Sequence, residues 1–158
     1  MFLFDKLKLQ LKEEEDLRLK VYDDATGKPL VKGMTLMGHP TIGIGRNLAG
    51  RGITEAEAFF LLANDIDDVY KSLIAIFPWF EALDDVRQRV LIDMAFNMGM
   101  EGFTGFRNTL RLVKLGHYED AASNMLESKW AEQVGRRALR LARMMRDGKD
   151  HPLNEDKI

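Results

Sequence analysis

The stretch TEAEAFFLLANDIDDVYKSLIAIFP, residues 54–78, decides the fold class because the hydrophobic period of the chain changes there. Its first four residues form a capping box, in which the Thr54 hydroxyl caps a helix and Glu57 reaches back. Pro78 is expected to end this helix. Hydrophobic residues then recur at steps of three and four, which predicts one buried stripe along a long helix: Phe59, Leu62, Ile66, Val69 and Leu73.

The residues before this stretch predict one helix and a small β lobe. Residues 2–14 are expected to be helical from their Lys, Gln and Glu content, although three of their leucines also alternate as in a strand. Residues 17–22, LRLKVY, alternate apolar and polar and predict a strand. Glycines and prolines then recur too densely for a stable helix, so short strands and turns are expected.

The residues after Pro78 predict an all-helical lobe. Residues 84–98 leave little polar surface in the second half of a helix, which indicates the buried centre of a helical domain. Gly99 is expected to close this helix with a left-handed cap. Shorter helices are expected at residues 105–114, 118–129 and 135–147.

The pattern as a whole predicts an α+β fold in a single domain of residues 1–158. A ligand is expected in a cleft where the two lobes meet. The expected parts are an N-terminal helix and β lobe at about 1–53, a connecting helix at about 54–77, a helical lobe at about 78–148, and a loosely held polar tail at 149–158.

Composition excludes several classes of protein. The chain has no cysteine, which excludes a disulfide scaffold, a thiolate metal site and a cysteine nucleophile. Its histidines, His39, His117 and His151, are far apart in sequence, so no metal site is expected, and no nucleotide loop points to a cofactor. The net charge of −2 gives no general attraction to nucleic acid or to a membrane. Without a long apolar segment or a signal peptide, a soluble protein made in the cytoplasm is expected.

Two carboxylates are candidates for chemistry. The run KEEED, residues 12–16, crowds acidic residues at the carboxyl end of a helix, where the helix dipole favours cations. The following strand can carry the chain from Glu15 to Asp24, and such a pair of carboxyl groups is what cleavage of a glycosidic bond needs. The alternatives are a solvated helix end and an ordinary turn, YDDATG.

Two further motifs have both functional and structural interpretations. In TIGIG, residues 41–45, the glycines allow a backbone or ligand to approach closely, or they form a tight strand or bulge. The basic run GRRALRLARMMR, residues 135–146, could bind nucleic acid or a membrane, but its alternation with apolar residues favours an amphipathic surface helix.

Seven motifs occur in an order and spacing that resemble the T-even bacteriophage lysozymes, the phage-type muramidases. They cover nearly everything from residue 13 to residue 148. The motifs are ExLRLKVYDD, TIGIGRNL, ITEAEA, DVRQRVLIDMAFNMG, GFTGFRNTLRL, YEDAASNMLESKW and QVGRRALRL.

The resemblance implies a lysozyme-like fold. It also implies hydrolysis of the β-1,4 bond between N-acetylmuramic acid and N-acetylglucosamine in peptidoglycan, without a cofactor. Glu15 would be the general acid, and Asp24 and Thr41 would hold the attacking water in an inverting reaction. Arg137 would neighbour the catalytic glutamate. Further substrate contacts are expected at Phe96, Asn97 and Asn124.

The resemblance also implies a biological setting. An endolysin of this kind would be a monomer that lyses the host wall. It would wait in the host cytoplasm until a holin-type membrane protein releases it, and it would then act on the wall in the periplasm. No binding of nucleic acid and no stable membrane association are expected.

The sequence departs from the family in the segment between Asp24 and Thr41, where relatives have only a short turn. The inserted residues are 25–40, and residues 28–39 among them are expected to form an extended, exposed hairpin or loop that leaves Thr41 in place. Alternatively, Thr26 or Thr35 could take its role. Arg46 replaces a histidine that usually follows TIGIG, the stretch from there to the capping box is shorter, and the net charge lacks the family's usual basic excess.

Three other functions fit parts of the sequence. A lytic transglycosylase uses one acidic residue and forms an anhydro sugar, whereas the presence of Asp24 and Thr41 favours water as the nucleophile. An inactive glycan-binding module would be indicated by loss of Glu15, which is present. A helical protein that binds nucleic acid would be favoured by a basic overall charge, which is absent.

Overall fold

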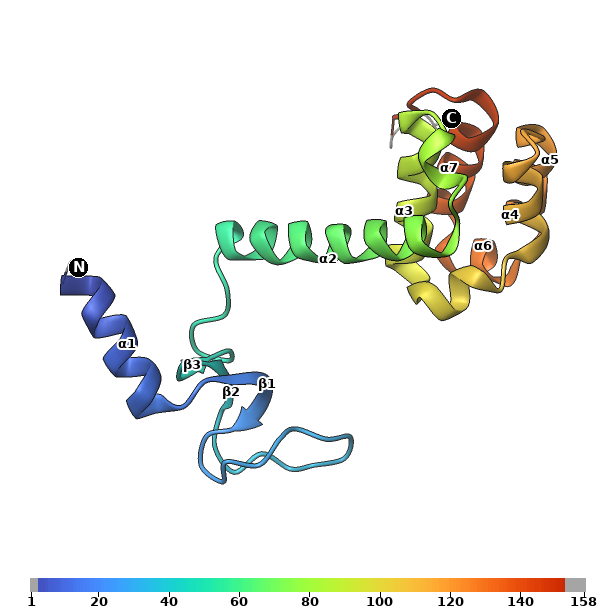
Figure 1. Cartoon of the computed structure of the whole chain (residues 1–158). Helices are drawn as coiled ribbons and strands as arrows, with labels where there is room; N and C mark the ends of the chain where they lie inside the picture. The colour runs from blue at the N-terminus through green and yellow to red at the C-terminus, as the bar shows by residue number, and fades with distance from the viewer. Residues whose placement is uncertain (1–2, 153–158) are drawn as a thin grey trace. The chain divides into compact units, whose positions relative to one another are not determined.

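The computed structural model describes residues 3–152, and the chain divides into two compact units between Phe59 and Phe60 (Figure 1). The first unit holds a helix and a three-stranded antiparallel sheet of order β1-β2-β3, and the second is helical. This confirms the predicted α+β class. The elements of the first unit are α1 (Leu3–Glu15), β1 (Arg18–Asp23), β2 (Pro40–Gly43) and β3 (Arg46–Asn47).

The sheet of the first unit begins at a sharp turn after α1. Asp16 makes that turn with φ 60°, a conformation that aspartate tolerates better than most residues with a side chain. In the sheet, Thr41 pairs with Tyr22 on one side and with Asn47 on the other. The turn therefore places Glu15 directly before the strand that pairs with Thr41.

The residues between β1 and β2 form a loop, defined here as the 24–39 loop. It contains no strand beyond an isolated bridge between Tyr22 and Pro29. Several of its hydrophobic side chains are exposed, including Met37 with an exposed fraction of 76%. The expectation of an exposed loop between Asp24 and Thr41 is confirmed.

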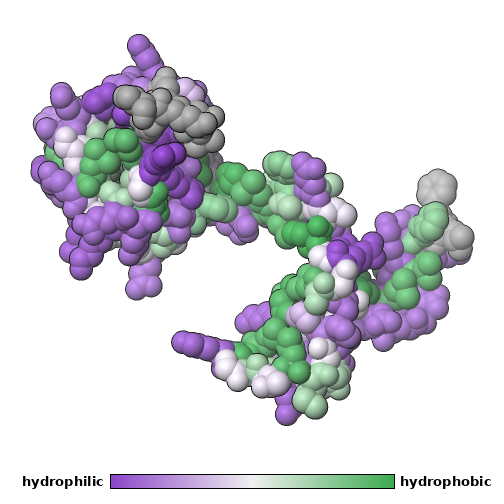
Figure 2. Space-filling model, turned by 180° about the vertical axis from the view of Figure 1, so that it is seen from behind, coloured by the Kyte–Doolittle hydropathy of each residue, from purple (hydrophilic) through white to green (hydrophobic). Residues whose placement is uncertain are grey.

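Helix α2 (Glu55–Ile76) begins with the predicted capping box. The Thr54 N–H and hydroxyl both donate to Glu57 Oε2, at 2.8 and 3.0 Å, and the Glu57 N–H donates back to the Thr54 hydroxyl at 3.2 Å. The predicted buried stripe is wrong for the first half of the helix. Leu73 is buried, but Phe59 is 61% exposed, and Figure 2 shows hydrophobic surface along α2.

The second unit packs its helices around one hydrophobic core. After α2 come η1 (Phe80–Ala82), α3 (Asp85–Thr104), α4 (Arg107–Lys114), α5 (Tyr118–Leu126), α6 (Lys129–Val134) and α7 (Arg136–Asp147). Helix α7 packs against both α3 and α5. The burial predicted for the second half of a helix at residues 84–98 holds in part: Phe96 is 42% exposed, but four residues before it are buried, Val90, Leu91, Met94 and Ala95.

Two predicted helix ends in this unit are wrong. Gly99 has φ 76° and ψ 159°, which kinks α3, but helix resumes and runs on to Thr104. The helix predicted at 118–129 stops earlier, because Ser128 leaves the helical conformation and caps a separate helix, α6. Its hydroxyl accepts the N–H of Ala131 at 3.1 Å and donates to the Met125 carbonyl at 2.6 Å.

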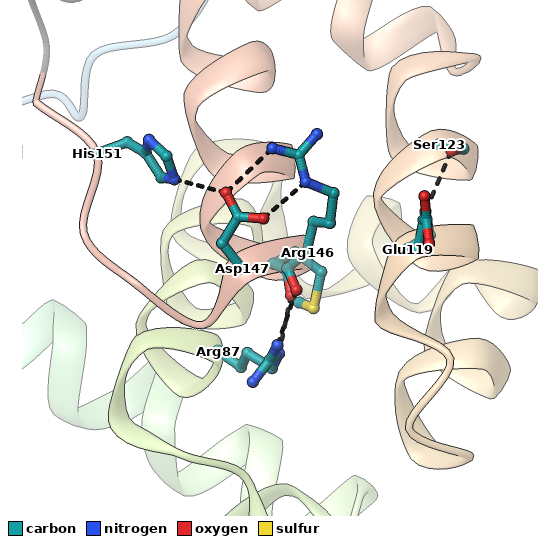
Figure 3. Close-up of polar contacts among 7 residues, drawn as sticks. Arg87, Glu119, Ser123, Arg146, Asp147 and His151 are labelled. Atoms are coloured by element: carbon teal, nitrogen blue, oxygen red, sulfur yellow. Dashed lines mark hydrogen bonds and ion pairs between the residues drawn. The ribbon is translucent and has the colours of Figure 1, made fainter.

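Arg87 joins three helices of the second unit, and Figure 3 shows its bond to the end of α7. Its guanidinium donates to the carbonyls of Met145 and Arg146, at 2.8 and 3.0 Å, and so caps the end of α7. The same group lies 3.6 Å from the ring centroid of Tyr118, at the start of α5. Because cations suit the carboxyl end of a helix, this arrangement stabilises the packing of α3, α5 and α7.

The first residues after α7 are held by ion pairs. Asp150 accepts two hydrogen bonds from Arg89, at 2.8 and 3.1 Å, and Asp147 contacts His151 at 2.9 Å (Figure 3). The expectation of a loosely held tail is therefore wrong for these residues. The rest of that tail, residues 153–158, lies outside the described residues.

Candidate active site

Glu15 presents an exposed carboxylate at the carboxyl end of α1. It lies against Gly45, in the turn between β2 and β3: a Cβ atom built on that glycine would be 3.0 Å from Glu15 Oε2. Gly43, two residues earlier, has no heavy atom within 4 Å of the corresponding position. The interpretation of TIGIG as a site of close approach therefore holds at Gly45. At Gly43 the reason for a glycine is the backbone conformation, which has φ 69°.

The two aspartates at the end of β1 have opposite environments. Asp23 is fully buried, and its carboxylate accepts the N–H groups of Ala25, Met37 and Gly38. These three hydrogen bonds hold the pKa of Asp23 below its usual value, and the bond from Met37 has the largest effect. With its oxygens occupied and no access to solvent, Asp23 is not available to donate or accept a proton in a reaction.

Asp24 has an exposed carboxylate that solvent can reach. Its Oδ1 accepts the backbone N–H of His39 at 2.7 Å, and its Oδ2 lies 3.5 Å from Nδ1 of the His39 ring. The structure therefore distinguishes the two members of the YDD motif. Asp24 is the one that can act on a bound molecule.

Thr41 is buried on β2, with an exposed fraction of 3%, and its hydroxyl donates to the His39 carbonyl at 3.2 Å. The same carbonyl accepts the Asp24 N–H at 3.1 Å, so Thr41 and Asp24 share a backbone partner. The two alternative threonines, Thr26 and Thr35, are exposed in the 24–39 loop. The burial of Thr41 is unfavourable to contact with a water molecule. Its link to Asp24 through the His39 carbonyl is favourable to a role beside that carboxylate.

Arg46 has a structural role in the first unit. Its guanidinium forms an ion pair with Glu57 of the capping box and donates to the Gly52 carbonyl at 2.8 Å. Hydrogen bonds from Thr54, together with the charge of Arg46, lower the pKa of Glu57. Arg46 thus ties β3 to the start of α2.

Arg137 and Phe96 lie on one cavity of the second unit. Arg137 Nε donates to Asp93 Oδ1 at 2.7 Å, and half-exposed Phe96 lines the same cavity of about 440 Å³. Sequence reasoning missed Asp93 as the partner of Arg137. Its signal was available, because Asp93 is a single charge within the apolar run VLIDMAF.

Asn97 and Asn124 each have a partner within the second unit. Asn97 accepts the indole N–H of Trp130 at 2.8 Å, and Asn124 accepts the hydroxyl of buried Thr109 at 2.7 Å. Asn124 lines a separate cavity of about 320 Å³, which shares no lining residue with the cavity of Phe96 and Arg137. The four expected substrate residues therefore do not share one pocket.

Within residues 3–152, no group of three or more His, Cys, Asp or Glu side chains is arranged to hold a metal ion. The helices described in that range are all too short or too polar to cross a bilayer.

Comparison with known proteins adds a family and three relatives. The family model described as phage lysozyme matches residues 12–146. Over 87% of its length, the chain is 32% identical to the pre-baseplate central spike protein of Enterobacteria phage T4, of which it covers 27%. It is 27% identical to a T4-type lysozyme of Dictyostelium discoideum, over 61% of this chain and 58% of that protein. It is 31% identical to the endolysin of Salmonella phage P22, over 74% and 76% of the two chains. The chain thus spans less than two thirds of the first two relatives.

Proposed function

Because the chain belongs to the phage lysozyme family, we propose that it is a peptidoglycan hydrolase of the endolysin type. It cleaves the β-1,4 bond between N-acetylmuramic acid and N-acetylglucosamine. The observation that supports this is the pair of exposed carboxylates on either side of β1, Glu15 against Gly45 and Asp24 against His39. Most enzymes that hydrolyse a glycosidic bond use two carboxyl groups of this kind.

In the proposed reaction, Glu15 is the general acid. It gives its proton to the glycosidic oxygen as the bond to the leaving sugar breaks, a contribution of about 10²–10⁴-fold to the rate. Its position at the free end of α1 leaves the carboxyl group open to solvent, and the glycine opposite leaves room for it. Glu15 therefore has both the access and the space that a proton donor needs.

Asp24 and Thr41 are proposed to hold the water that attacks the sugar from the opposite face. This makes the reaction an inverting one, which needs space for a water between the second carboxylate and the ring. The shared His39 carbonyl supports the assignment, because it fixes Asp24 and Thr41 to the same segment of backbone. Hydrolysis by water, rather than formation of an anhydro sugar, follows from these roles.

Arg137, Phe96, Asn97 and Asn124 are proposed to contact the glycan or its peptide. Arg137 and Phe96 offer a cation and an aromatic face on one cavity. Asn97 and Asn124 each use their amide oxygen within the protein, which leaves the amide N–H groups to donate to a substrate.

The proposed setting is lysis of a bacterial host. The enzyme is proposed to be a monomer, without nucleic-acid binding or stable membrane association. It would stay in the host cytoplasm until a holin-type protein opens the membrane, and it would then act on the wall in the periplasm.

Loss of turbidity of purified bacterial walls tests the proposed function. The wild type should clear the walls, Glu15→Gln should not, and the matched control Glu13→Gln should clear them, because Glu13 belongs to the same acidic run without the proposed role. Clearing by Glu15→Gln above a few per cent of the wild-type rate would refute the role of Glu15. Failure of the wild type to clear walls would refute the function itself.

A further inference from the structure

The buried carboxylate of Asp23 closes the 24–39 loop from inside. Its Oδ1 accepts the N–H groups of Ala25 and Gly38, both at 3.0 Å, and its Oδ2 accepts that of Met37 at 2.8 Å. Ala25 lies at the beginning of the loop, whereas Met37 and Gly38 lie at its end. A buried charge is costly unless hydrogen bonds satisfy it, so these three bonds hold the two ends of the loop together.

The residue that follows this clamp holds both members of the proposed water site. The His39 N–H donates to Asp24 Oδ1 at 2.7 Å. The His39 carbonyl accepts the Asp24 N–H at 3.1 Å and the Thr41 hydroxyl at 3.2 Å. Because His39 is bonded directly to Gly38, any shift of the clamped backbone would move these contacts.

Gly38 shows how closely this backbone approaches Asp24. A Cβ atom built on Gly38 would lie 2.1 Å from Asp24 Oδ1 and 2.8 Å from the backbone nitrogen of Ala25. Such distances leave no space for a side chain. The end of the loop is thus pressed against the carboxylate that the proposed reaction uses.

We propose that Asp23 is a positioning residue for the reaction: it clamps Met37 and Gly38 so that the backbone of His39 fixes the carboxylate of Asp24. Asp23 acts through Asp24 and does not touch the substrate. The inference rests on the proposed function of Asp24. It explains why a long insertion next to the site is compatible with catalysis, since the insertion itself supplies the backbone groups that orient Asp24.

Misplacing a catalytic group by about 1 Å can lower a rate by about 10²-fold. Asp23→Asn keeps the shape of the side chain but replaces one accepting oxygen with an amide N–H₂, which cannot accept a backbone N–H. We expect Asp23→Asn to lower kcat on purified wall fragments by about 10²-fold while KM stays near the wild-type value. The matched control Asp5→Asn, an exposed aspartate on α1, should leave both constants unchanged.

A double variant separates positioning from a general loss of structure. If Asp23 acts only through Asp24, the combination Asp23→Asn with Asp24→Asn should have the same kcat as Asp24→Asn alone. A wild-type kcat in Asp23→Asn would overturn the inference. The inference would also be overturned if the kcat of the double variant were lower than that of Asp24→Asn by the factor seen in Asp23→Asn, because Asp23 would then act independently of Asp24.

A second variant covers the case in which Asp23→Asn does not fold, as judged from its amide NMR spectrum. Gly38→Ala leaves the Asp23 carboxylate intact but pushes directly on Asp24, and it should also lower kcat more than it raises KM. A wild-type kcat in Gly38→Ala would overturn the inference. In all these cases the wild type and Glu15→Gln are assayed together, so loss of the proposed function itself would be seen as a wild type that does not cleave walls.

Discussion

The carboxylate of Glu15 lies against the backbone of Gly45, where an added Cβ atom would be 3.0 Å from Oε2. Gly45 has φ 67°, which also favours glycine at this position. The end of α1 and the turn between β2 and β3 therefore meet at the proposed proton donor. This contact lies within the first unit and requires no other part of the chain.

Gly45→Ala should lower activity more than Gly43→Ala does. Both glycines have positive φ, so each substitution should cost about 1–2 kcal/mol of stability. Only the methyl group at Gly45 would press on Glu15, because the space around Gly43 is empty. Wall-clearing rates and urea denaturation of both variants check this, and equal loss of activity would contradict a role for the Gly45 contact.

Thr41→Ala should lower kcat by about tenfold, the effect of one hydrogen bond of ~1.4 kcal/mol in the transition state. Thr26→Ala and Thr35→Ala, both at exposed positions in the 24–39 loop, should have little effect. Initial rates on wall fragments check this. Should Thr41→Ala prove harmless and one of the loop variants inactive, the water-holding threonine would lie in the insertion.

Arg87→Met should destabilise the second unit by about 2–3 kcal/mol, since hydrogen bonds to charged groups contribute about 1.5–3 kcal/mol. The Arg87 side chain is only 13% exposed. Its removal would take away the donor to the carbonyls of Met145 and Arg146 at the end of α7. Arg111→Met is the matched control, because the Arg111 side chain is exposed and donates to Asn108 on the same helix. Urea denaturation followed by tryptophan fluorescence measures the stability of both variants. Equal midpoints would contradict the stabilising role of Arg87 at the end of α7.

The stability of the first unit should fall in acid in a way that depends on Asp23. The folded state lowers the pKa of Asp23 from 3.8, chiefly through the Met37 N–H. Its carboxylate therefore stabilises the fold fully above that value, and the contribution is lost as the pH falls through the lower folded pKa. The protection factors of the Gly38 and Met37 amides, which correct for the intrinsic pH dependence of hydrogen exchange, should fall below pH 3.8 in the wild type. Protection that stays constant down to the pH of global unfolding would contradict this.

Local sequence signals predicted the parts of the fold that depend on neighbours in the chain. The capping box of Thr54 and Glu57 was predictable to individual atoms because both residues lie within one helical turn. The buried positions from Val90 to Ala95 in the middle of α3 were predictable from the apolar pattern. The kink at Gly99 was not, because a glycine that leaves the helical conformation can either end a helix or only interrupt it.

The candidate site was predictable in its residue types but not in its contacts. The pattern that suggested Glu15 and Asp24 gave no reason to separate Asp23 from Asp24, since both stand in one turn motif. The difference arises from Met37 and Gly38, which are far away in sequence and reach Asp23 only through the closure of the 24–39 loop. The exposure of Phe59 was missed because helical periodicity marks an apolar face without showing what covers it.

Mass analysis of the fragments released from purified walls tests the proposed reaction and its proton donor together. The wild type and Glu13→Gln should release fragments that have gained one water per cleaved bond and end in reducing N-acetylmuramic acid. Glu15→Gln should release almost none. Fragments that end in an anhydro sugar, or hydrated fragments released by Glu15→Gln at the wild-type rate, would contradict hydrolysis with Glu15 as the acid.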